Sequence, residues 1–121
     1  MPDDNYVELR EGYVYARLPK GMPSSVTVDV AKSAVAMCVE HNSFKLMTNI
    51  RDFAENPPPT MELFSLVVSV SRIWNTAIKL AVVDPAKWLK LDTFGGTVAR
   101  NRGINFSHFT SEEDALKWLL A

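Results

Sequence analysis

One apolar stretch decides the fold class of this 121-residue chain: Ala77-Ile78-Lys79-Leu80-Ala81-Val82-Val83. Only the lysine within it is polar, β-branched residues are frequent, and Asp84-Pro85 ends it. Such a run is typical of a central strand that is buried on both faces, as in a parallel sheet covered by helices on each side. We therefore expect an α/β fold built around this strand.

Two helix-and-strand units are predicted upstream of this run. The first helix has its N-cap among residues 22–25 and runs to about Asn42, because apolar residues recur there at helical spacing. The segment Phe44–Ile50 forms the next strand, and a proline-rich loop follows it. A second helix, with Thr60 as its N-cap, runs through Trp74.

The two ends of the chain complete the pattern. Near the N-terminus, Tyr6–Leu9 and Tyr13–Leu18 flank a short connection that contains Gly12, which predicts an antiparallel hairpin. The elements predicted downstream are a turn of helix at 87–91, a helix at 93–101 that Gly103 ends, a strand at 105–109, and a last helix opened by a capping box at 110–113.

The expected element order is therefore β-β-α-β-α-β-α-β-α in one domain spanning residues 1–121. No linker is long enough to divide it. Strands separated by helices require right-handed parallel crossovers, so we expect a mixed, mostly parallel sheet with helices packed on it.

Composition narrows the classes of function. The net charge of −1 gives no broad electrostatic reason to expect nucleic-acid binding. No apolar run approaches the length that spans a bilayer, so no integral membrane segment is expected. The polar start of the chain, 1–5, does not resemble a secretory signal. With Cys38 as the single cysteine, no internal disulfide or zinc site is expected, and a reducing cytoplasm is the predicted location.

Catalytic motifs are missing from the sequence. It has no nucleophile elbow, no paired histidines at metal spacing, no phosphate loop and no dinucleotide fingerprint. We therefore predict no enzyme, no metal and no cofactor. Catalysis would require Asp52, His108 or Cys38 to meet in one pocket.

Two features suggest a binding function. The second helix is almost entirely apolar over Leu63–Val70, so it is either enclosed by the fold or presents an apolar surface to a partner or ligand. The loop Arg51–Thr60 follows a strand, and ligands gather beyond the carboxyl ends of strands in open α/β sheets. The candidate partner- or ligand-binding residues are Arg51, Asp52, Thr60, Phe64, Val67 and Val68. Arg100 and Arg102 could contact an anion or complement a helix C-terminus.

Several segments resemble the SpoIIAA-like group of STAS-related bacterial domains. They are Arg51-Asp52-Phe53, Ile78–Val83, Phe94–Phe106, Phe109-Thr110 and the positions Glu113, Ala115, Leu116, Trp118 and Leu119. The resemblance covers most of the chain and is strongest from about Ile78 to the end. It implies a STAS-like sheet flanked by helices, and many members of the group have no assigned activity.

The resemblance also bears on the kind of partner. In the related anti-sigma-factor antagonists, phosphorylation of a serine at a helix start switches partner binding; the matching region here offers Thr60 after three prolines instead. A likeness of the group to lipid-binding domains of the Sec14 type implies an apolar ligand. We therefore expect a non-catalytic regulatory or protein-interaction domain, whose partner is another protein or a second copy of this chain. The alternative is a carrier or sensor of a small apolar or amphipathic, lipid-like ligand, with Arg51 or Arg100 holding an acidic head group.

Overall fold

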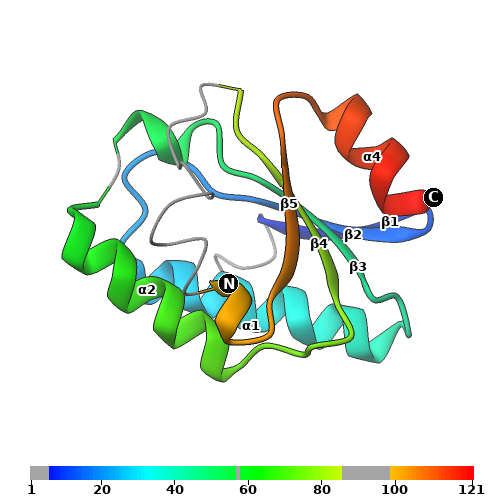
Figure 1. The fold of residues 1–121 in the computed structure, drawn as a ribbon, viewed down its shortest axis with the longest axis horizontal. Coiled ribbons are helices and arrows are strands. Elements are labelled where there is room, and N and C mark those ends of the chain that lie inside the picture. The colour runs from blue at the N-terminus through cyan, green and yellow to red at the C-terminus, as the bar shows by residue number, and fades with distance from the viewer. Residues whose placement is uncertain (1–5, 57, 86–98) are drawn as a thin grey trace.

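The fold is an α/β domain with one five-stranded mixed sheet. The computed structural model describes residues 6–56, 58–85 and 99–121. Its strands are β1 (Val7–Arg10), β2 (Tyr13–Arg17), β3 (Lys45–Asn49), β4 (Lys79–Val83) and β5 (Asn105–Phe109). They lie in the order β1-β2-β3-β4-β5, and only β1 and β2 are antiparallel (Figure 1). The predicted fold class and the mostly parallel sheet are confirmed.

Helices follow the strands in the predicted order. They are α1 (Ser24–Glu40), the 3-10 helix η2 (Phe53–Glu55), α2 (Thr60–Arg72) and α4 (Glu112–Leu120). Residues 99–101, ahead of β5, are also helical. The predicted turn of helix at 87–91 and most of the predicted helix at 93–101 lie outside the described residues.

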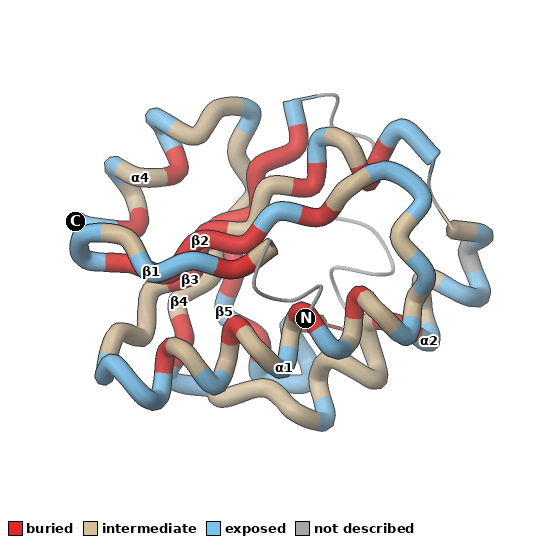
Figure 2. The backbone as a smooth tube through the Cα atoms, turned by 180° about the vertical axis from the view of Figure 1, so that it is seen from behind, coloured by how far each residue is buried: buried red, intermediate tan, exposed pale blue. Residues whose placement is uncertain are grey.

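Helices cover both faces of the sheet. The parallel strands β2, β3 and β4 are neighbours in sequence order, so right-handed crossovers carry α1 and α2 over the same face. The helix α4 follows the last strand and packs on the opposite face, against β3, β4 and β5 (Figure 1). Figure 2 shows buried residues concentrated in the strands, while each helix is buried along one side only.

Strand register assigns side chains to the two faces. Residues two apart in a strand point to the same side of the sheet. On the face covered by α1 and α2, two rows cross the parallel strands: Val14, Leu46, Leu80 and Phe106 in one, and Ala16, Thr48, Val82 and His108 in the other. These rows form the floor on which the candidate site is built.

Prolines, not hydroxyl side chains, precede the first two long helices. Pro23 occupies the N-cap position of α1 and Pro59 that of α2, both with extended backbone. The fixed φ of proline suits this position, so each helix starts directly after its proline. The predicted N-cap role of Thr60 is therefore wrong, because Thr60 is the first residue of α2.

Two further boundaries differ from the predictions. The helix α2 ends at Arg72, so Trp74 lies beyond it rather than inside it. At α4 the N-cap is Ser111, whose hydroxyl accepts a hydrogen bond from the Asp114 backbone N–H at 3.2 Å. The capping motif thus begins one residue later than predicted.

Gly103 ends the helical segment ahead of β5, as predicted. Its φ of +87° is favourable only for glycine. The Ile104 N–H donates to the Ala99 carbonyl at 3.1 Å and the Gly103 N–H to the Arg100 carbonyl at 3.0 Å, the two bonds of a Schellman motif. This reversal carries Ala99 and Ile104 to the sheet face that α1 and α2 cover.

Candidate functional site

An apolar cavity of about 180 Å³ lies between α1, α2 and the sheet. Its floor consists of strand residues from the two rows described above: Ala16, Leu46, Thr48, Leu80, Val82 and Phe106. Leu18, Ile50 and Phe53 extend it beyond the strand ends, and Ala99 and Ile104 contribute from the segment before β5. The cavity therefore gathers residues from nearly every element on this face of the sheet.

Small residues of α1 make room for the cavity. The helix contributes Thr27, Val30, Ala31 and Ala34, which recur at the spacing of a single helix face. Ala34 is only 1% exposed, yet its side chain is a single methyl group. Because two of the four wall positions are alanine, α1 can pack close to the sheet without filling the space above it.

The wall formed by α2 is a second apolar stripe. Leu63, Leu66, Val67 and Val70 share one helix face, and only Leu66 is fully buried. Among the described elements α2 packs mainly against α1 rather than on the strands. The sequence left open whether this apolar helix is enclosed by the fold or exposed on the surface. In the structure, one side of the helix faces the cavity.

Hydrogen-bonding groups are scarce in the cavity wall. Of the described lining residues, only Thr27, Thr48 and Trp74 carry polar side-chain atoms, and none is charged. The Thr27 hydroxyl already donates to the Pro23 carbonyl at 3.0 Å. The indole N–H of Trp74 is buried and has no hydrogen-bond partner in the described part of the chain. A ligand here would meet an apolar surface with few polar groups.

The predicted residues of α2 divide into two sets. Val67 lines the cavity. Phe64 and Val68 are half-buried and do not line it. Thr60 stands at the start of the helix. The helical spacing separates Val67 from its apolar neighbours, so it alone of these positions belongs to the cavity stripe.

Arg51 and Asp52 belong to an ion-pair cluster at the carboxyl ends of β2 and β3. The Arg51 Nε donates to Asp52 Oδ1 at 3.2 Å, and the Arg17 guanidinium lies 3.6 Å from Asp52 Oδ2. Neither Arg51 nor Asp52 lines the cavity, although their chain neighbours Ile50 and Phe53 do. Asp52 therefore forms ion pairs with two arginines, Arg17 and Arg51, next to the end of the cavity.

The two other predicted arginines follow the helical segment 99–101. The guanidinium carbon of Arg100 lies 4.3 Å from the ring centroid of Phe106, which is a cavity residue. Arg102 is exposed. The structure thus brings Arg100, but not Arg102, into contact with the cavity wall.

Asp84 and His108 meet at the carboxyl ends of β4 and β5. Asp84 is 0% exposed, and its Oδ2 lies 3.9 Å from His108 Nε2. His108 stands beside Val82 in the sheet, on the cavity side, but does not line the cavity. Sequence reasoning treated this histidine as isolated, because only the pairing of β4 with β5 brings it to Asp84.

Another reactive side chain singled out by the sequence is Cys38. Cys38 is fully buried in α1, and burial raises the pKa of its thiol to about 11. A thiol with such a pKa is almost entirely protonated at neutral pH and is a poor nucleophile. Cys38, Asp52 and His108 are all absent from the cavity wall. Within the described ranges, no group of three or more potential metal ligands occurs.

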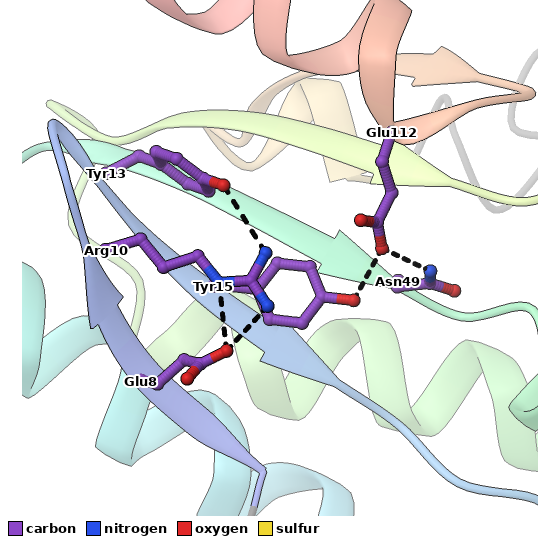
Figure 3. A network of polar contacts seen from close by, with 6 residues as sticks. All are labelled: Glu8, Arg10, Tyr13, Tyr15, Asn49 and Glu112. Carbon is purple, nitrogen blue, oxygen red and sulfur yellow. Dashed lines mark hydrogen bonds and ion pairs between the residues drawn. The ribbon is translucent and has the colours of Figure 1, made fainter.

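A polar cluster ties α4 to the opposite face of the sheet (Figure 3). The Tyr15 hydroxyl donates to Glu112 Oε2 at 2.5 Å, and the Asn49 amide donates to the same oxygen at 2.7 Å. Arg10 stacks 3.6 Å from the Tyr15 ring centroid and pairs with Glu8 at 2.6 Å. Each member has a partner within the cluster, which indicates a structural tether.

The cluster shifts two pKa values. Burial, and then the bond to Glu112, raises the pKa of Tyr15 to about 12. Burial alone would raise the pKa of Glu112, but the hydrogen bonds from Tyr15 and Asn49 outweigh it and lower that pKa. Stabilisation by Glu112 is therefore complete above its unfolded-state pKa of about 4.3 and is lost as the pH falls through the lower folded-state pKa.

Replacing Glu112 with glutamine is expected to lower the free energy of unfolding at pH 7 by about 1 kcal/mol, because charge-assisted bonds become neutral ones at a partly exposed site. The deficit should shrink as the pH falls below about 4, where the wild-type carboxylate is protonated too. Denaturant unfolding at both pH values checks this. Glu113→Gln, at an exposed position of the same helix turn, is the control and should change little. Equal stability of Glu112→Gln and wild type at pH 7 would contradict the tether.

No protein-family model matches this chain, and no curated protein resembles it in sequence. The resemblance to SpoIIAA-like domains therefore stays a prediction. In the part of the chain that the structure describes, no helix has the length and apolar character needed to cross a membrane. The cavity and its described wall are the features of this chain that bear most directly on function.

Sequence reasoning overlooked Trp74 and Asp84 as site residues. The apolar helical pattern places Trp74 at the end of the second predicted helix, and Asp84 only bounds the predicted strand. One signal was present for each: a tryptophan needs a partner for its N–H when buried, and an aspartate directly after a buried strand lies at the carboxyl edge of the sheet.

Proposed function

We propose that this domain binds a compact, largely apolar small molecule between α1, α2 and the sheet, as a carrier or a sensor. The supporting observation is the half-open 180 Å³ cavity, whose described wall is almost entirely apolar. An apolar cavity of about 150 Å³ in another protein stays dry and binds benzene. The space here therefore suits a molecule built around one ring or a short branched chain.

A ligand that fills this half-open space would stabilise the folded domain, because a molecule that binds only the folded state raises the free energy of unfolding. Binding and stability should therefore rise together.

Titration with cumene (isopropylbenzene), an apolar probe of suitable size, tests the proposal. Methyl resonances of Leu63, Val67 and Leu80, which line the cavity, should shift as the probe is added. Those of Val83 and Leu119, on the opposite face, should not. We expect a Kd below about 1 mM and a higher melting temperature at saturation. Absence of both effects would overturn the proposal.

A second candidate is association of two copies through α2. Met61 is 76% exposed at the start of this helix, and Phe64 and Val68 are half-buried beside the cavity stripe. A partly buried apolar surface with one exposed residue at its edge suits a symmetric contact. Sedimentation over a range of concentrations should then reveal a dimer that Met61→Glu dissociates. A monomer at every concentration would remove this candidate.

Both proposals are non-catalytic and place the protein in the cytoplasm. The absence of Cys38, Asp52 and His108 from the described cavity wall supports the first part. A buried free thiol as the single cysteine is compatible with a reducing compartment. Turnover that disappears when His108 or Asp84 is replaced would contradict the non-catalytic assignment.

A further inference from the structure

The strand β1 lies at one end of the sheet, and part of its backbone faces away from the neighbouring strand. The Arg17 N–H donates to the Tyr6 carbonyl at 2.8 Å, which fixes how hydrogen bonds alternate between β1 and β2. Two residues further along, Glu8 directs its backbone groups to β2 in the same way, whereas Val7 and Leu9 direct theirs outward. Among the described residues, no strand lies beyond β1. An edge with outward N–H and C=O groups can accept a further strand.

Two exposed apolar side chains adjoin this edge, one on each face of the sheet. Leu9 is 45% exposed and stands beside Val14, on the face that α1 covers. Leu120 is 44% exposed at the end of α4, and a Cβ atom added to Gly12 would lie 3.4 Å from its Cδ2 atom. Figure 2 shows the end of α4 beside the hairpin of β1 and β2. The edge is therefore bordered by apolar surface that a partner could bury.

The charges of Glu8 and Arg10 limit which strand fits this edge. Both side chains are partly exposed, and within one chain they form an ion pair at 2.6 Å. When two copies of β1 lie antiparallel with Leu9 opposite Leu9, each Glu8 stands opposite the Arg10 of the other copy. These are non-hydrogen-bonded positions, at which side chains lie closest together. The two neighbouring registers that keep the outward groups paired set Glu8 against Glu8 or Arg10 against Arg10.

We infer that two copies of this chain associate through β1, antiparallel about Leu9, so that the sheet of one domain continues into the other. Charge complementarity carries the inference, because the register that pairs unlike charges also lets the N–H and C=O of Leu9 bond across the two-fold axis. Leu9 does not line the cavity, so this contact is independent of ligand binding, and it is separate from the α2 surface proposed above. Because a short strand supplies few hydrogen bonds, we expect a weak dimer with a Kd of about 0.1 mM.

Charge exchange tests the proposed pairing by sedimentation equilibrium. Glu8→Arg and Arg10→Glu each place like charges opposite one another across the axis, so each should raise the dimer Kd at least about tenfold. An equimolar mixture of the two variants should form a dimer again, since basic residues of one chain then face acidic residues of the other. Repulsion within each chain persists in the mixture, so this recovery requires contact between chains. Glu11→Arg is the control and should change the Kd little, because Glu11 would stand opposite the uncharged Val7.

Amide hydrogen exchange supplies a second readout in the wild-type protein. The Leu9 N–H should gain protection as the protein concentration rises above the Kd, whereas the Glu8 N–H, which points to β2, should be protected at every concentration.

Three results would overturn the inference. The first is a monomer at about 1 mM protein, and the second is a dimer that the mixture of charge variants fails to restore. A dimer that Met61→Glu dissociates and that both charge variants leave intact would assign the contact to α2 instead. None of these results bears on the cavity, so the ligand-binding proposal is tested separately.

Discussion

Ala34→Leu is expected to reduce cumene affinity by more than about tenfold while leaving the fold intact. Ala34 lines the cavity from α1, so the three added carbon atoms would occupy the space a ligand needs. Burial of these carbons contributes about 2 kcal/mol, and overpacking costs about 1–3 kcal/mol. Since these terms nearly cancel, the free energy of unfolding should change little.

Calorimetric titration with cumene and denaturant unfolding measure the two quantities separately. Ala36→Leu is the matched control, because Ala36 is exposed on the same helix and does not line the cavity. It should bind cumene like wild type. Should Ala34→Leu fail to fold, Ala31→Leu blocks the same wall from a half-buried position. Unchanged affinity in a folded variant would place the ligand elsewhere.

Leu119→Ala is expected to lower the free energy of unfolding by about 2–5 kcal/mol. Leu119 is 0% exposed and packs with Tyr15, Met47, Ala81 and Val83, where α4 covers the sheet. The truncation leaves a void beneath a helix of only nine residues, at one of its two fully buried positions. The loss would amount to a large share of the stability of a small domain.

The neighbouring residue supplies the control for this second experiment. Leu120 is 44% exposed, so Leu120→Ala removes the same atoms from a half-open position. We expect a loss below about 1 kcal/mol. Guanidinium unfolding of both variants compares them directly. Similar losses at the two positions would mean that α4 does not pack on the sheet through Leu119.

Local chemistry made much of the fold predictable. The apolar run around Leu80 marked an interior strand, the Gly12 connection marked a hairpin, and Gly103 marked a helix end that requires a positive φ. Each of these patterns determines the conformation of its own short segment, within a few residues along the chain. The element order and the mixed sheet followed from them.

The candidate site was less predictable, since it depends on long-range packing. Val67 was predicted as a ligand-binding residue because it belongs to an apolar helix, but the pattern could not separate it from Phe64 and Val68. The meeting of Asp84 and His108 depends on the register of β4 and β5. The cavity itself depends on how far α2 stands from the sheet, and no local pattern encodes that distance.

The way α2 is held has a kinetic consequence for a bound molecule. Among the residues of α2 whose burial is described, only Leu66 is buried, and the helix packs mainly against α1 among the described elements. Segments with few buried contacts open at lower free energy than the central strands. Brief detachment of this helix would widen the half-open cavity while the sheet stays paired, so a bound molecule can exchange without unfolding of the whole domain.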